Sequence, residues 1–117
     1  MKRFFAAFAL LISMAMPLFA ATEPAFPGGE EAMNKYISEN LQYPAMAKEN
    51  GVEGIVNVAF TVKSDGSIGS IKIVRMIDPD LEQEAIRLVK SMPKWTPADD
   101  GENHVDATAT VAIPFIL

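Results

Sequence analysis

The 117-residue chain has no cysteine and only one histidine, so it lacks most of the side chains on which enzymes and metal sites depend. Without cysteine there is no disulfide, no thiolate ligand, no thiol nucleophile and no thiol to carry a lipid. The one imidazole, His104, stands in a polar loop, where we expect it to be solvated. The sequence therefore predicts a protein that is not an enzyme and that binds no cofactor.

Acidic side chains are plentiful but form no metal motif. Asp78, Asp80, Glu82 and Glu84 occupy alternate positions, yet the run has no glycine at which a calcium-binding loop could turn. The favourable effect of acids at the N-terminus of a helix accounts for them. We therefore predict no metal site.

Basic residues are scarce, with 10 Lys and Arg against 15 Asp and Glu and a net charge of −5. Lys2 and Arg3 precede an apolar run and then two small residues, Ala20 and Ala21, a pattern typical of a secretory signal peptide. Removal of residues 1–21 would leave 8 basic and 15 acidic residues, a net charge of −7, which disfavours nucleic acid as a partner. The alternative is an uncleaved membrane anchor, for which the run is short of the required length of about 20 residues.

Two helices are predicted at the start of the mature chain. Met33, Ile37 and Leu41 recur four residues apart, which indicates one face of an amphipathic helix. Pro44 suits the first position of a second, short helix because its missing N–H is not needed there, and Gly51 is expected to end that helix.

An alternating strand and a return strand follow. The apolar face of the first strand is predicted to consist of Val56, Val58, Phe60 and Val62. With a two-residue Asp-Gly turn at positions 65 and 66, Phe60 is expected to lie opposite Ile71, and Val58 opposite Ile73.

A second main helix and a last strand complete the pattern. Asp78 and Pro79 are a good N-cap and a good first residue for the helix. Its predicted buried stripe is Leu81, Ala85, Leu88, Val89 and Met92, and its predicted water-facing residues are Glu82, Glu84, Arg87 and Lys90. The last strand is predicted over residues 105–117, with Val105, Ala107, Ala109, Val111, Ile113, Phe115 and Leu117 on its apolar face.

This order of elements predicts an α+β domain in residues 22–117. A right-handed crossover places the last strand parallel to the second strand and antiparallel to the first. We therefore predict a three-stranded antiparallel sheet in the order second-first-third, with helices packed on one face. The last strand is then an edge, which Pro114 near its end also indicates.

A strand edge and two aromatic side chains are the candidate binding features. The edge leaves backbone groups free to pair with an added strand, and its candidate residues are Val105, Ala107, Ala109, Val111 and Ile113. Tyr43 and Trp95, each near a proline, are of the type enriched at interface centres. The alternative for both rings is packing on the domain's own core.

Four stretches carry a resemblance to a known family: QYPAMAKENGVEGIVNVAFTV, SDGSIGSIKIVR, DPDLEQEAIRLVKSMPKWTPA and VAIPFIL. Their ordered motifs are Tyr-Pro-x-x-Ala, Gly-x-x-Gly before a strand, an Asp-Gly turn and Pro-x-Trp-x-Pro. In these features the chain resembles the C-terminal domain of TonB-family energy transducers. The leading FPGGEEAMNKYISENLQYP looks like the extra helix of many such domains from Bacteroidota.

The resemblance implies both a fold and a function. The family fold has two helices on a three-stranded sheet. Family members bind the TonB-box segment of outer-membrane receptors in the periplasm, beside the last strand. By resemblance, Gln42, Tyr43 and Pro44 lie near that contact, and the partner is an extended peptide segment, such as that of a TonB-dependent receptor, in outer-membrane transport.

The chain also departs from a full transducer. Only about 20 residues separate the predicted signal from Tyr43, a short tether at about 3.3 Å per extended residue. The leading hypothesis is therefore a periplasmic peptide-binding domain. Two alternatives stay open: a minimal transducer anchored in the inner membrane, and a structural or regulatory module that forms a homodimer through its strand edge.

Overall fold

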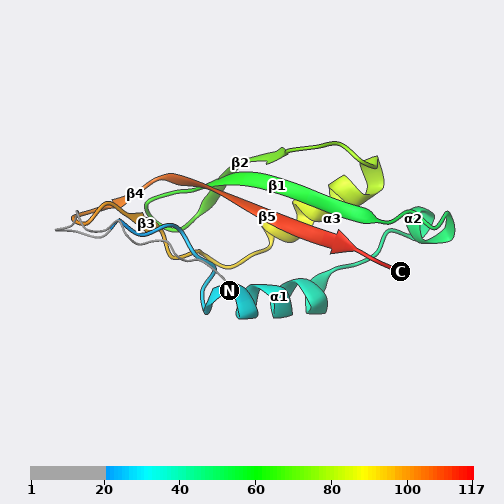
Figure 1. Cartoon of the computed structure of the whole chain (residues 1–117), viewed down its shortest axis with the longest axis horizontal. Helices are drawn as coiled ribbons and strands as arrows, with labels where there is room; N and C mark the ends of the chain where they lie inside the picture. Colours follow the sequence, from blue (N-terminus) through cyan, green and yellow to red (C-terminus); the bar gives the residue numbers. More distant parts are fainter. Residues whose placement is uncertain (1–20) are drawn as a thin grey trace, which may run out of the picture.

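The structure, a computed structural model, describes residues 21–117 and contains three helices and five strands in that range (Figure 1). In chain order these are α1 (Gly29–Asn40), α2 (Ala45–Glu49), β1 (Gly54–Val62), β2 (Ile68–Ile73), α3 (Pro79–Lys90), β3 (Ala98–Asp99), β4 (His104–Val105) and β5 (Ala107–Phe115). The predicted signal peptide lies outside the described residues except for its last residue, Ala21. Between residues 21 and 117, no helix has the length and apolar character needed to cross a membrane.

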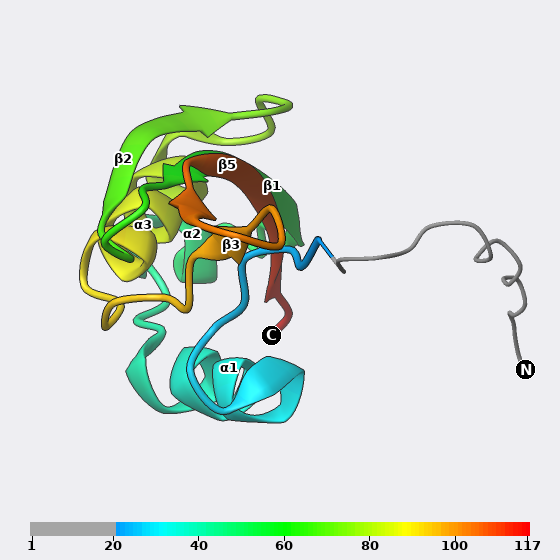
Figure 2. The same ribbon diagram turned by 90° about the vertical axis from the view of Figure 1, so that its left-hand side faces the viewer.

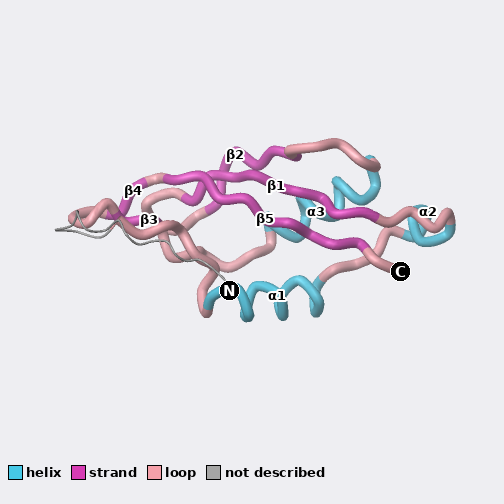
Figure 3. Tube along the Cα trace, viewed as in Figure 1, coloured by secondary structure: helices cyan, strands magenta, loops and turns pink. Residues whose placement is uncertain are grey.

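The main sheet is antiparallel, and its order β2-β1-β5 confirms the prediction. β1 and β5 pair without interruption, from Gly54 opposite Phe115 to Val62 opposite Ala107. α3 lies against the sheet, and in the view of Figures 1 and 3 α1 lies on the β5 side of the molecule. Seen from the end, the helices lie on the same side of the curved sheet (Figure 2). The predicted α+β class is therefore confirmed.

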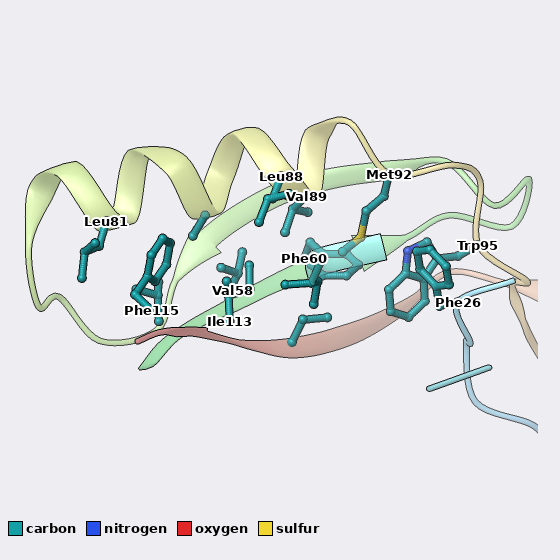
Figure 4. Packing of buried hydrophobic residues seen from close by; sticks show 14 of the residues in the cluster. Phe26, Val58, Phe60, Leu81, Leu88, Val89, Met92, Trp95, Ile113 and Phe115 are labelled. Atoms are coloured by element: carbon teal, nitrogen blue, oxygen red, sulfur yellow. The ribbon is translucent and has the colours of Figure 1, made fainter. Parts of the chain in front are cut away.

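One hydrophobic core fills the space between the sheet and the helices (Figure 4). The four apolar residues predicted on the inner face of β1 are buried, and so is the whole predicted stripe of α3. Asp78 caps α3 as predicted, because its carboxylate accepts hydrogen bonds from the N–H groups of Asp80 and Leu81 at 3.0 and 3.1 Å. The alternation of apolar residues in the sequence thus corresponds to the observed core.

The turn between β1 and β2 differs from the prediction. Lys63 N–H donates to the Ser67 carbonyl at 2.8 Å, so three residues, not two, form the turn. Gly66 has a φ of 88° and accepts a hydrogen bond from Trp95 N–H at 2.9 Å. A Cβ at Gly66 would lie 2.4 Å from the Trp95 carbonyl oxygen. Docking of the turn against the Trp95 backbone therefore accounts for its longer form.

A β-bulge compensates for the longer turn. The β1–β2 register shifts between Ala59 and Thr61, where Ser70 takes a φ of 51°. Val58 lies opposite Ile73 as predicted, but the predicted pairing of Phe60 with Ile71 is absent from the ladder. Because the bulge adds one residue to β2, its isoleucines still pack against the core.

Three element boundaries also differ from the prediction. Val105 belongs to β4, which pairs with β3, and β5 begins only at Ala107. The Asp106 carboxylate between them accepts a hydrogen bond from Ser64 N–H at 2.7 Å, which ties this junction to the β1–β2 turn. Leu117 is 54% exposed, so the buried stripe of the last strand ends at Phe115. Pro44 is the N-cap of α2 with an extended ψ of 136°, and not its first helical residue.

Candidate functional site

The main sheet has two outer strands, and they differ in regularity. β2 has six residues and is interrupted by the bulge at Ser70. β5 has nine residues in continuous register with β1. A regular edge presents its unpaired groups at the spacing that another strand needs. β5 is therefore the edge better suited to pair with a further strand.

The outward-facing backbone groups of β5 follow from the hydrogen bonds of β1. Lys63 N–H donates to the Ser67 carbonyl just before β2, and the Asn57 carbonyl accepts from Val74 N–H just after β2, so odd-numbered residues of β1 point toward β2. Even-numbered residues of β1 must then point toward β5, because successive residues alternate along an antiparallel ladder. Their partners on β5 are the odd-numbered residues, from Ala107 to Phe115.

The even-numbered residues of β5 consequently direct their backbone groups away from the sheet. These residues are Thr108, Thr110, Ala112 and Pro114. The first three offer both an N–H and a C=O at the edge, whereas Pro114 offers only a C=O. The predicted residues Ala107, Ala109, Val111 and Ile113 use their backbone groups to hold β5 to β1, and the side chains of the last three pack in or against the core.

A groove of about 460 Å³ borders this edge. Four consecutive residues of β5, Thr108 to Val111, line it. Since successive side chains point to opposite faces of a strand, a hollow that touches all four must meet the strand along its backbone edge. The opposite wall comes from residues 23–26 and from the first turns of α1. The outward N–H groups of Thr108 and Thr110 therefore lie beside an open groove.

Tyr43 lies at the other end of β5 and is fixed there by two contacts. Its hydroxyl donates a hydrogen bond to the Val52 carbonyl. Its ring packs edge-to-face on Phe115, with centroids 5.6 Å apart. Burial raises the pKa of the Tyr43 phenol above its ordinary value, so this group stays a donor at neutral pH. These contacts give the ring a structural role, and the residue remains partly exposed.

Glu84 and Arg87 hold the segment before Tyr43, an arrangement that the sequence did not indicate. Glu84, predicted to face water, is only 8% exposed. Its carboxylate accepts from Gln42 N–H at 2.7 Å and from Arg87 Nε and Nη2, each at 2.7 Å. Arg87 Nη2 also donates to the Asn40 carbonyl at 2.9 Å. We refer to Glu84 and Arg87 with these backbone partners as the Glu84 clamp.

The clamp determines the charge of Glu84. Burial opposes ionisation, but the hydrogen bonds from Arg87 and from the Gln42 N–H together outweigh it, so the pKa of Glu84 lies below its ordinary value. A surface groove of about 570 Å³ lies beside the clamp, between α3 and the Gln42–Ala45 segment. Gln42, Tyr43 and Pro44 all line it. The structure therefore brings these three predicted residues together.

Trp95 lies in the core, as the alternative for this residue expected. It is 6% exposed, and its ring meets Phe60 and Phe26 edge-to-face at 5.1 and 5.9 Å (Figure 4). Its buried Nε1–H has no hydrogen-bond partner within residues 21–117. Trp95 lines the β5 groove, but as a buried residue it does not project from the surface toward a partner. In the same described range, no three His, Asp or Glu side chains are grouped as metal ligands.

Together these features define a small α+β domain with one regular strand edge that is unpaired within residues 21–117. The chain belongs to the family described as the Gram-negative bacterial TonB protein C-terminal, whose model matches residues 39–117. That range runs from the end of α1 through the Gln42–Pro44 segment to β5 and the last residue.

Individual relatives agree with this assignment. TonB from Helicobacter pylori strain J99 is 39% identical over 70 residues, which cover 59% of this chain and 25% of that protein. TonB from Pseudomonas aeruginosa PAO1 is 38% identical over 53 residues, 45% of this chain and 15% of that protein. The solution structure of the Helicobacter pylori TonB C-terminal domain aligns with a TM-score of 0.57 and 30% identity, covering 73% of this chain and 77% of that one. The chain spans a quarter or less of the length of these curated relatives.

Proposed function

We propose that this protein is a periplasmic TonB-like domain that binds an extended peptide segment by strand addition at β5. The proposed partner is a segment such as the TonB box of an outer-membrane receptor, and the proposed role is in outer-membrane transport. The observation that carries the proposal is the outward direction of the backbone groups of Thr108, Thr110 and Ala112, the first two of which line a groove. Membership of the TonB C-terminal family supports it.

The direction of the amides provides a test at single-residue level. Amide exchange is measured by NMR on the mature domain, residues 22–117, with and without a synthetic TonB-box peptide. We expect new protection at Thr108, Thr110 and Ala112, whose N–H groups point outward. Ala109 and Val111 already bond to β1 and should change little. New protection confined to another part of the domain, or none at millimolar peptide, would refute strand addition at β5.

A proline substitution tests the same edge in a second way. Thr110→Pro removes one outward N–H and leaves the bonds between β1 and β5 intact, which an edge position tolerates. One main-chain bond is worth about 0.5–1.5 kcal/mol, so peptide affinity should fall about 2- to 12-fold. Thr110→Ala is the matched control, because it removes the side chain but keeps the N–H. Equal affinity of both variants would contradict a backbone-mediated contact.

Two alternatives from the sequence concern the setting of this domain. In the first, residues 1–21 remain attached and anchor a minimal energy transducer in the inner membrane. Mass spectrometry of the N-terminus of the protein from cell fractions separates this from a secreted form. In the second, β5 pairs with β5 of another copy to form a homodimer. Sizing of the domain with and without peptide tests it, since a peptide on β5 should dissociate such a dimer.

A further inference from the structure

Most of α1 lies outside the part of the chain that the family model matches. The match begins at residue 39, so only the last two residues of α1 fall within it. In Figure 1 the helix lies below β5, and residues of both elements line the same two hollows. Its 12 residues span about 18 Å at 1.5 Å per residue. The outward edge from Thr108 to Pro114 spans about 20 Å at the rise of a strand. α1 is therefore nearly as long as the outward edge of β5.

α1 lines two hollows that also touch β5, one near each end of the strand. The groove beside Thr108 and Thr110 is followed by a second hollow of about 310 Å³, which Pro114 lines. Along α1 and its C-cap, the first hollow is lined by Gly29, Glu30 and Met33, and the second by Asn34, Ile37, Ser38 and Leu41. These residues lie three or four positions apart, the spacing of a single helix face. We call this surface the α1 wall.

The chemistry of the wall changes along its length. Met33, Ile37 and Leu41 give it an apolar middle and far end. At the Thr108 end, Glu30 of α1 and Glu23 of the preceding segment line the groove, and both are exposed. Within residues 21–117, neither hollow is lined by a basic side chain. An occupant of this space therefore meets an apolar surface with negative charge at one end.

We propose that the α1 wall selects the side chains of the peptide that pairs with β5, which rests on the strand addition proposed above. A strand in the plane of the sheet turns every second side chain toward the helix side. Those side chains contact Met33, Ile37 and Leu41 and are apolar. A Lys or Arg of the peptide lies at its Thr108 end, next to Glu23 and Glu30. The backbone of β5 supplies affinity, and α1 supplies sequence preference.

Charge removal on α1 tests the basic position. Binding is measured by isothermal titration calorimetry for seven-residue peptides of alternating valine and threonine, with Lys at either end, and for the same peptides with Gln instead. The wild-type domain should bind the peptide with Lys at one of its two ends about 2- to 5-fold more tightly than the matching Gln peptide, as expected for an exposed ion pair. The preference should vanish in Glu23→Gln/Glu30→Gln and persist in Glu31→Gln/Glu39→Gln, which changes the same charge at positions outside the groove.

A bulky side chain tests the wall itself. Asn34 lines the second hollow and its neighbour Lys35 does not, although both are exposed. Asn34→Trp should weaken all the peptides by on the order of tenfold, whereas Lys35→Trp should leave affinity unchanged. If peptide protects Thr108, Thr110 and Ala112 as expected but Asn34→Trp and Lys35→Trp change affinity equally, the proposed role of α1 is wrong and strand addition still holds. Absence of that protection in wild type would overturn strand addition, and the role of α1 with it.

Discussion

Glu84→Gln is the substitution that most directly tests the Glu84 clamp. The change keeps the size of the side chain and removes its negative charge. In the native protein the carboxylate accepts two hydrogen bonds from Arg87 and one from Gln42 N–H. An amide in its place turns an N–H₂ toward one of these donors. The variant should therefore weaken the link between α3 and the segment that carries Tyr43.

The expected loss can be estimated from the exposure of each partner. The side chain of Arg87 is 42% exposed, so water replaces its bonds and the pair contributes at most about 1 kcal/mol. Gln42 N–H bonds to a charged acceptor that is itself buried, and such a bond is worth about 1.5–3 kcal/mol. Glu84→Gln should cost about 1–2 kcal/mol, and Glu84→Ala, which leaves Gln42 N–H without a partner, about 2–3 kcal/mol.

Urea unfolding of the domain followed by Trp95 fluorescence measures these losses, since the single tryptophan is buried in the native state. Gln83→Ala, at an exposed neighbour on α3, is the control and should cost little. The folded pKa of Glu84 is lowered from 4.5, so its stabilisation is complete above that pH and disappears as the pH falls through the folded pKa. The gap between wild type and Glu84→Gln should therefore be constant near neutrality and shrink below about pH 4.5. A gap below about 0.5 kcal/mol at pH 7 would refute the clamp as a stabilising element.

Two further predictions concern backbone positions, and both use urea unfolding. Gly66→Ala should cost more than about 2 kcal/mol for two reasons: its Cβ would lie 2.4 Å from the Trp95 carbonyl oxygen, and alanine would have to adopt an unfavourable positive φ. Gly51→Ala, with a φ of 66° and no atom within 4 Å of its Cβ, should cost only about 1 kcal/mol, and equal losses would contradict the docked turn. Asp78→Ala should cost about 1 kcal/mol through loss of the α3 N-cap, and Asp78→Ser should restore most of it. If alanine and serine destabilise equally, the cap does not stabilise α3.

The sequence predicts the layered fold well because local signals and burial agree. Alternation in β1 and β5, the stripe of α3 and the cap at Asp78 each depend on residues close in sequence. The turn at Gly66 is different, since its length depends on hydrogen bonding to Trp95, far along the chain. The bulge at Ser70 is a consequence of that turn and has no signal of its own. Local sequence patterns therefore predict which face of a helix or strand is buried better than they predict the pairing register between strands.

The site is less predictable than the fold for the same reason. Glu84 stands among other charged residues of α3, and its burial depends on a backbone N–H 42 positions away. Val105 continues the apolar alternation of β5, and only the pairing of β4 with β3 shows that it belongs elsewhere. The helix α1 was predicted from its periodicity, but no pattern within it shows that it borders the outer strand. Contacts between distant segments decide these features.

The outward amides of β5 also determine how a bound segment would respond to mechanical force. Hydrogen bonds in an antiparallel or parallel ladder run across the strands, so tension directed along β5 acts on all of them at once, in shear. Thr22 and Ala25 pair with Asp99 and Thr96, which attaches the start of the described chain near the β3–β4 end of the domain. A pull between that point and a segment lying along β5 would be directed largely along the strand. Rupture would then require many bonds to break together, whereas peeling from one end would break them singly.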